Sequence, residues 1–397
     1  MKKNILLLAG FFITCSITAQ TQGTIFISPT NYEGVLSDVT NSARAEALGK
    51  NSITLDGIRT AFENPACIAP GTEKIQMALN YTKGHGTYPK SYYPAGGFSY
   101  KVTDKLTLGI ATHHWIDPDS YWNAQIGNQD FDTDKKAQHV YSFIAGYKIG
   151  KHLYAGLSGN LLREMEIKGK TTAKDFMVNT GIIYDRAVSL FKSTKVTNQR
   201  LRLAASLYNT LFDGEIIQRA NETVFQYRDM PAILRLGSSY RFSTPVNLPF
   251  AQKGKKLKEQ PQELSLTASI QYGNYLKARK NYTKEYKYQT MTGFGLEATA
   301  LDILSLRLGY FSETRQGPVN SLDRYATKDR QKGFTWGLGC NLPFEKWSQQ
   351  KVPLNLRFDI LAKQLPDLLD ENISTRLSPD FTDKKLFLSL GIEISIK

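Results

Sequence analysis

The chain has 397 residues and a formal net charge of +14; 41% of its residues are hydrophobic and 22% are charged. This composition suits a folded core and excludes an intrinsically disordered chain. Beyond the N-terminus, no apolar run approaches the ~18 residues of a spanning helix, which excludes a protein of several membrane helices. A soluble β-protein and a membrane β-barrel remain, because barrel strands carry apolar residues only at every second position.

The N-terminus has the pattern of a secretory signal peptide. Lys2 and Lys3 give a basic start, residues 5–19 are mostly apolar, and small residues end the apolar stretch. The apolar part is too short for a stable anchor, so we expect cleavage near Ala19 or Gln20 and export from the cytoplasm. The signal peptide is therefore predicted over residues 1–19.

Cysteine usage and charge restrict the chemistry of the exported chain. Cys15 raises the alternative of a lipidated N-terminus, but it lies within the apolar part of the signal. Cys67 and Cys340 are interpreted as small hydrophobic residues without a redox role. The positive charge is spread along the chain, and no nucleic-acid-binding motif accompanies it. We therefore expect attraction to anionic lipid or to an acidic partner, and no nucleic acid.

Residues 20–72 lack a sustained alternation of apolar and polar residues. They contain two short motifs, Ser42-Ala43-Arg44 and Asn64-Pro65-Ala66. The second motif is either an ordinary turn, since Pro biases its predecessor away from helix, or part of a plug. A large barrel has a wide lumen, so if the following strands close into one, this segment is predicted to be a hatch inside it.

From residue 73 onward, apolar and polar residues alternate in one segment after another. The clearest is Leu386 to Ile396, where aliphatic residues occupy the even positions and mostly small or polar residues lie between them. Its ~11 residues match a tilted membrane strand. We predict fourteen such strands, over residues 74–81, 92–102, 106–114, 139–149, 153–167, 176–184, 201–208, 233–242, 264–272, 288–300, 304–310, 334–342, 354–360 and 386–396.

The connections alternate between short and long, as in bacterial outer-membrane barrels with short periplasmic turns and long outer loops. Short turns are predicted at residues 103–105, at 150–151 and around Asp302. The predicted long polar loops are residues 117–137, 209–230, 274–286, 313–333 and 363–384. Two inner connections are longer than expected, 186–199 and 243–262, and the second is expected to project as a basic loop containing Lys253, Lys255, Lys256 and Lys258.

A soluble β-protein of fourteen strands is the alternative to the barrel. It would need some strands buried on both faces, and the chain has few continuous apolar runs. The sequence therefore favours an all-β, transmembrane antiparallel barrel of about fourteen strands over residues 73–397. Its expected location is the cell outer membrane, in contact with outer-membrane lipid.

The N-terminal motifs resemble the hatch of the FadL-like outer-membrane β-barrel superfamily. Ser42-Ala43-Arg44 begins a stretch that continues to Leu48-Gly49, and Asn64-Pro65-Ala66 follows before the first strand. The order is most similar to the PorV and PorQ branch, which is associated with type IX secretion. Hatches of this family usually have a second Gly after Leu-Gly, where this sequence has Lys50. The resemblance implies a plugged fourteen-stranded barrel.

Residues that carry reaction chemistry show no pattern of an active site. His113 and His114 are adjacent on a predicted strand and point to opposite faces, so they do not share a metal ion. No nucleophile elbow or phosphate-binding loop is present. We expect no enzyme activity, no catalytic residue, no metal and no cofactor.

Four arginines are predicted to face the lumen: Arg202, Arg235, Arg307 and Arg357. They are interpreted either as contacts for an anion or carboxylate, or as members of an internal ion-pair network with Glu297, Asp359 and Glu393.

Two functions remain open. In the first, which the PorV and PorQ resemblance implies, the barrel is a type IX secretion accessory that engages cargo proteins or secretion-machinery components. In the second, it is a FadL-like transporter of hydrophobic small molecules across the outer membrane.

Overall fold

The computed structural model describes the strands of the chain, most of its short turns and part of the N-terminal segment. The described residues are 40, 42–85, 92–117, 124–126, 129–131, 136–167, 170–193, 196–208, 215–220, 223–229, 232–245, 263–276, 290–316, 328–344, 354–365 and 385–396. The predicted signal peptide and the lysines at 253, 255, 256 and 258 lie outside these residues.

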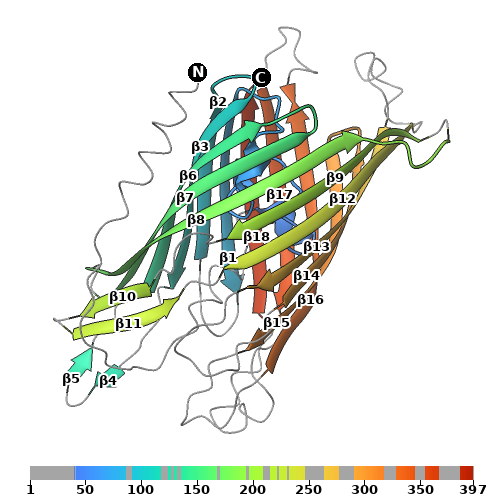
Figure 1. Ribbon diagram of the computed structural model, residues 1–397. Helices are drawn as coiled ribbons and strands as arrows, with labels where there is room; N and C mark the ends of the chain where they lie inside the picture. The colour runs from blue at the N-terminus through green and yellow to red at the C-terminus, as the bar shows by residue number, and fades with distance from the viewer. Residues whose placement is uncertain are drawn as a thin grey trace.

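Fourteen long strands in this part of the chain form one closed antiparallel barrel (Figure 1). Each strand pairs with its neighbours in sequence, and β1 pairs with β18 to close the wall. The barrel strands are β1 (Ile75–His85), β2 (Tyr92–Lys101), β3 (Leu106–Asp117), β6 (Lys136–Lys148), β7 (Leu153–Ile167), β8 (Lys170–Ala187), β9 (Thr197–Tyr208), β12 (Ile233–Pro245), β13 (Glu263–Tyr275), β14 (Thr290–Ala300), β15 (Leu304–Gln316), β16 (Lys328–Pro343), β17 (Leu354–Leu365) and β18 (Lys385–Ile396).

Every predicted strand corresponds to one of these barrel strands, so the predicted fold is confirmed. The prediction was wrong at some strand ends, since β8, β15 and β16 extend six residues beyond the predicted strands, and it missed short hairpins in two segments expected to be loops. These are β4 (Ala124–Ile126) with β5 (Gln129–Phe131), and β10 (Glu215–Ala220) with β11 (Thr223–Asp229). A two-stranded ribbon outside the barrel has no face that must be buried, so its sequence lacks the regular alternation used to find strands.

The short turns lie at one end of the barrel, the end that the topology assigns to the periplasm. Between β14 and β15 the turn has two left-handed residues, Leu301 at φ 58° and Asp302 at φ 57°, closed by a hydrogen bond from Ile303 N–H to Ala300 C=O. Two consecutive residues of positive φ are typical of a type I′ turn, whose twist matches that of the flanking strands. This predicted turn is confirmed.

The two faces of the wall differ as the alternation predicts. Outward side chains include Leu79, Phe143 and Phe334, with 66%, 63% and 78% of their surface exposed. Inward positions of the same strands are buried and often polar, such as Asn80 and Ser142. A closed barrel with an exposed apolar outer face is stable in a lipid bilayer, because every backbone group of the wall has a partner. The protein is an outer-membrane barrel.

Helices in the described residues are short, and none has the length and apolar character needed to cross a membrane.

Residues 42–72 lie inside the barrel, shown in blue in Figure 1. Their elements are α3 (Ala43–Ala47), η1 (Ile58–Thr60) and η2 (Pro65–Ile68). Helix α3 packs against β15 to β18, η1 against β1 to β3, and η2 against β6 to β8. Apolar side chains of this segment share buried clusters with the wall, as Ile53 does with Ile183 and Ile58 with Ile144. We call residues 42–72 the inner segment.

Candidate functional site

The first motif of the inner segment forms a capped helix that is tied to the wall. The Ser42 side chain accepts a hydrogen bond from Ala45 N–H, which satisfies a free donor of the first turn of α3. Arg44, two residues later, donates from Nε to Glu297 Oε1 on β14 at 3.0 Å. The backbone N–H of Ala43 donates to Asn80 Oδ1 on β1 at 3.1 Å. The motif therefore fixes one end of the inner segment to two sides of the barrel.

The second motif caps η2 and lies against two wall glycines. Asn64 Oδ1 accepts from Ala66 N–H at 3.1 Å, and Pro65 occupies the first helical position, where no N–H is needed. Asn64 Nδ2 donates to Ile53 C=O at 3.0 Å. A Cβ atom at Gly156 would overlap the backbone of Pro65 and Ala66, and one at Gly181 would overlap Asn64 Oδ1. The glycines allow this motif to contact the wall backbone directly.

Lys50 occupies the position at which the hatches that the N-terminal motifs resemble usually have a glycine. Its backbone is left-handed, at φ 65°, which is unfavourable for a residue with a Cβ. Its Nζ lies 2.6 Å from Glu313 Oε1 on β15, and both side chains are buried. The ammonium group also lies 5.2 Å from the ring centroid of Phe311. A buried ion pair therefore joins this left-handed position to the wall.

Two of the four predicted arginines belong to an ion-pair network between the inner segment and the wall. Arg307 is fully buried, with Nε 2.7 Å from Glu297 Oε1 and Nη1 2.7 Å from Asp359 Oδ1. Arg357 Nε lies 3.2 Å from Asp359 Oδ2, and Arg357 Nη2 lies 3.5 Å from Glu297 Oε1. The inner segment contributes Arg59, whose Nη1 lies 2.9 Å from Asp359 Oδ2. Arg59 also pairs with Glu393, the third acidic residue of the predicted network.

Arg202, the third arginine, has different partners from those predicted. It pairs with Asp185 on β8, which Arg200 also contacts, and its Nη1 lies 2.7 Å from Asp56 Oδ1 of the inner segment. The same Nη1 donates to Thr54 C=O at 2.8 Å. Arg202 therefore bridges the wall and the inner segment.

Arg235, the fourth arginine, differs from the other three. Only 8% of its surface is exposed, and it has no ion pair within the described part of the chain. Its Nε and Nη1 atoms are buried without a hydrogen-bond acceptor, and its guanidinium carbon lies 6.0 Å from the ring centroid of Tyr208. A buried guanidinium without a carboxylate keeps its full desolvation cost, so the site suits an anion or a polar acceptor supplied from outside the chain.

Phe62 of the inner segment lies between Tyr208 on β9 and a buried histidine on β3. Its ring centroid is 5.7 Å from that of Tyr208 and 5.7 Å from that of His113, both in edge-on geometry. His113 is 1% exposed, and neither ring nitrogen has a hydrogen-bond partner among the described residues. We call Phe62, His113, Tyr208 and Arg235 the Phe62 site.

Further buried polar atoms without a partner occur on the inner wall of the same half of the barrel. Within the described residues they include Ser206 Oγ, Gln138 Oε1 and Asn160 Oδ1. Ser206 is the direct cross-strand neighbour of Arg235. Buried polar groups normally have partners, so several unsatisfied groups in one region mark a place for water or a polar ligand. The Phe62 site combines such groups with aromatic rings.

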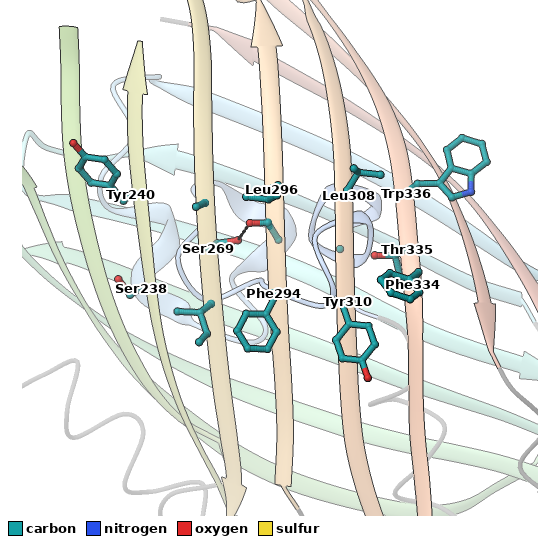
Figure 2. A pocket seen from close by; sticks show the side chains of 14 residues that line it. Ser238, Tyr240, Ser269, Phe294, Leu296, Leu308, Tyr310, Phe334, Thr335 and Trp336 are labelled. Atoms are coloured by element: carbon teal, nitrogen blue, oxygen red, sulfur yellow. Dashed lines mark hydrogen bonds between the residues drawn. The ribbon is translucent and has the colours of Figure 1, made fainter. Parts of the chain in front are cut away.

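A separate apolar groove of about 720 Å³ lies across β12 to β16. Figure 2 shows the inner segment behind these strands, with Trp336 directed away from it. Phe294 and Trp336 are 48% and 51% exposed, as expected for the membrane-facing side. The groove is therefore on the outer face of the wall, separate from the Phe62 site.

The remaining chemistry-bearing residues form no catalytic arrangement in the described part of the chain. No group of three or more His, Cys, Asp or Glu side chains lies close enough there to hold a metal ion. His113 faces the lumen, whereas His114 lies beside His139. Cys67 is buried in the inner segment, and burial raises the pKa of its thiol, which keeps it protonated and unreactive.

Sequence reasoning missed the residues that hold the inner segment from the wall side. Gly293 and Gly309, for example, face inward from the strands and lie against the backbone of Gly49. A Cβ atom at either position would overlap that backbone. Their signal was present, because glycine is unfavourable in a strand interior and marks the close approach of another backbone. Lys50 and Arg59 were also missed as cations, since a lone charge in an unpatterned segment does not reveal its partner.

These features define a closed fourteen-stranded membrane barrel that encloses its own N-terminal segment. Similar solved structures include the toluene transporter TbuX of Ralstonia pickettii, at 12% identity and a TM-score of 0.44, covering 89% of this chain and 97% of that one. The toluene transporter TodX of Pseudomonas putida has 12% identity and a TM-score of 0.42, with 89% and 96% covered. A Pseudomonas aeruginosa FadL homologue has 12% identity and a TM-score of 0.43, with 94% and 99% covered.

No protein-family model matches the sequence, and no curated protein matches it. The FadL homologue bears the name of the superfamily that the N-terminal motifs resemble, whereas the PorV and PorQ branch has no support among these neighbours. At these identities and TM-scores the likeness assigns neither a family nor a function to this chain.

Proposed function

We propose that the protein is an outer-membrane channel for small, mainly apolar molecules that carry one polar or anionic group. The observation that carries this proposal is the Phe62 site, where Arg235 and His113 are buried with unsatisfied N–H or ring nitrogen atoms. Phe62 and Tyr208 supply aromatic surface beside them. A ligand with an apolar body and one acceptor group would satisfy both parts of the site.

The inner segment is proposed to act as the gate of this channel. It fills the lumen at the level of α3 and η2, and it is tied to the wall by the ion pairs of Arg44, Lys50 and Arg59. Passage therefore requires at least part of the segment to move, while the strand pairing of the wall stays intact. Arg202, Arg307 and Arg357 are proposed to hold the segment in place, and Arg235 to contact the ligand.

The test compares benzoate with toluene, for which two of the neighbours are named. The two molecules share one ring, and only benzoate has an acceptor for Arg235. We expect the refolded barrel to bind benzoate more tightly than toluene. Arg235→Gln should weaken benzoate binding by about 1.5–3 kcal/mol, the contribution of hydrogen bonds to charged groups, and leave toluene binding unchanged. Calorimetry in detergent measures both constants.

Arg241→Gln on the same strand is the matched control, because Arg241 is exposed and pairs with Asp302 at the periplasmic turn. Equal benzoate affinity in the Arg235→Gln variant and the unmodified protein would refute the ligand role of Arg235. His113→Phe removes the second polar group and should lower benzoate affinity by a smaller amount.

The type IX interpretation uses the same barrel with a protein partner. It stays a prediction, and the described loops and walls contain no feature that favours it over the channel. Co-purification from outer membranes distinguishes the two functions, because an accessory protein brings down secretion cargo or machinery components and a channel brings down small hydrophobic molecules.

A further inference from the structure

Part of the connection between β8 and β9 folds back onto the outer face of the barrel wall. We call its residues 188–193 the rim segment. The ring centroid of Phe191 in this segment lies 6.1 Å from that of Tyr240 and 6.0 Å from that of Phe242, both on β12. Tyr240 and Phe242 lie on the same face of β12 as Leu236, which is 47% exposed on the membrane-facing side. The rim segment therefore contacts the surface that the barrel presents to lipid.

This contact lies at the periplasmic end of the barrel and has an unusual composition. Arg241, between the two aromatic residues of β12, pairs with Asp302 of a short periplasmic turn. The turn at residues 103–105, at the same end, consists of polar residues. The rim segment instead presents two large apolar side chains, Leu190 and Phe191, which are 64% and 52% exposed. Exposed apolar side chains of this size mark a surface that meets another apolar phase.

The side chain of Gln199 on β9 holds the backbone of the rim segment against the wall. Gln199 Oε1 accepts hydrogen bonds from Phe191 N–H at 2.9 Å and from the Tyr240 hydroxyl at 2.6 Å, and Gln199 Nε2 donates to Phe191 C=O at 2.7 Å. A β-bulge lies at this point, where the register between β9 and β12 shifts and Asn198 is left-handed at φ 50°. Bulges commonly re-aim a side chain. The backbone of Phe191 and the amide of Gln199 thus satisfy each other without water.

We propose that the rim segment is a membrane-interface anchor, held in place by Gln199, whose partner is the periplasmic leaflet of the outer membrane. Leu190 and Phe191 enter the boundary between lipid head groups and hydrocarbon, the level at which aromatic residues of barrels gather. Lys192 follows them in sequence, and its long side chain reaches back to the head groups. Irregular backbone does not enter the hydrocarbon interior, so the anchor stays at the interface.

The partner is lipid because the rim segment continues a surface that already faces lipid. Tyr240 contacts Phe191 on one side and lines the apolar groove across β12 to β16 on the other (Figure 2). That groove lies on the outer wall of the barrel, beside exposed side chains such as Phe294 and Trp336. The apolar surface therefore runs without a break from the wall to the rim segment.

The test measures the membrane depth of a nitroxide spin label at position 190 in the full-length barrel, refolded into vesicles of phosphatidylethanolamine and phosphatidylglycerol. Leu190→Cys carries the label in a Cys15→Ser, Cys340→Ser background, in which Cys67 is fully buried and stays unlabelled. Oxygen dissolves preferentially in hydrocarbon, whereas a neutral nickel chelate stays in water. We expect the label to collide more with oxygen than with the chelate. Gln199→Ala should reverse this preference, because it frees the backbone of the rim segment.

Gly150→Cys is the matched aqueous control, since it lies in a turn at the same end and an added Cβ there meets no atom within 4 Å. Its label should collide more with the nickel chelate. Leu296→Cys, at a position 60% exposed on the outer wall, is the lipid reference. Heat-modifiable gel mobility confirms that each labelled variant is folded.

Two results at position 190 would overturn the proposal. A preference for the nickel chelate equal to that at position 150 would place the rim segment in water. Weak collision with both reagents would mean that protein covers the segment, which in these vesicles is a second copy of the chain. A label that keeps its preference for oxygen in the Gln199→Ala variant would refute the positioning role of Gln199.

Discussion

Arg59 of the inner segment donates from Nη1 to Asp359 of β17 at 2.9 Å, although the two residues are 300 positions apart in sequence. Asp359 is also contacted by Arg307 and Arg357 of the wall. One buried carboxylate on the wall therefore holds three guanidinium groups, of which only one belongs to the inner segment. This asymmetry allows the segment to be loosened without leaving the wall carboxylate unpaired.

Arg59→Met should release the inner segment and preserve the barrel. The substitution removes the cation whose side chain is only 5% exposed, while Asp359 keeps two arginines. The loss to the segment is about 1.5–3 kcal/mol, the contribution of hydrogen bonds to charged groups. We expect maleimide to modify Cys67, which is fully buried in the unmodified protein, at a higher rate.

The labelling is measured in a Cys340→Ser background, so that Cys67 is the thiol observed in the folded barrel. Arg241→Met serves as the control, since that arginine is exposed at the periplasmic turn. A rate for Arg59→Met equal to that of the control would show that the ion pair does not hold the segment.

Substitutions of Lys50 compare the cost of its left-handed backbone with the contribution of its buried ion pair. Lys50→Met keeps the left-handed backbone and removes the buried ion pair with Glu313, at a cost of about 1.5–3 kcal/mol. Lys50→Gly also loses the ion pair but relieves the backbone strain, which is worth about 1 kcal/mol. Urea unfolding should therefore rank the unmodified protein first, Lys50→Gly second and Lys50→Met third. A Lys50→Gly variant more stable than the unmodified protein would mean that the ion pair contributes little.

The wall glycines should be intolerant of side chains only where the inner segment touches them. Gly156→Leu places atoms where the backbone of Pro65 and Ala66 lies, and backbone cannot rotate away as a side chain can. We expect a folded barrel with a displaced segment and a reactive Cys67. Gly150→Leu, in a turn with no other atom within 4 Å of the added Cβ, should behave like the unmodified protein. Protected Cys67 in Gly156→Leu would contradict the contact.

Two neighbours on β15 test the assignment of the faces. Leu306 is 51% exposed on the outer wall, and Leu306→Arg should cost about 2–4 kcal/mol near the membrane centre. Arg307→Leu should cost less, because Glu297 keeps Arg44 and Asp359 keeps other cations. Folding yield in lipid vesicles, scored by heat-modifiable mobility, measures both. A larger loss for Arg307→Leu would reverse the ranking.

Removal of the inner segment tests the gate directly. Deleting residues 23–63 leaves every strand pairing of the wall, so the barrel should still insert into the membrane. Conductance to small ions in planar bilayers should rise, since residues 42–63 of the deleted stretch lie in the lumen. The full-length protein measured in parallel is the reference. Unchanged conductance in a folded deletion variant would refute the gating role.

The sequence alone was sufficient to predict the fourteen strands, because a strand with one face in lipid and one in the lumen must alternate along its length. Leu386 to Ile396 shows this most clearly. It was also sufficient to single out Ser42-Ala43-Arg44 and Asn64-Pro65-Ala66, since capping residues act on neighbours two or three positions away. Both partners of such a contact lie within a few residues of each other, so a short sequence pattern is enough to predict it.

Only the tertiary structure decided which partner each buried charge has. The four arginines have the same alternation in sequence, yet Arg202 and Arg307 are in ion pairs and Arg235 is not. The difference depends on which part of the inner segment lies beside each one, and on which wall glycines let it approach. Barrel closure brings Arg59 to Asp359 across 300 positions, and no local pattern encodes a contact between residues so far apart.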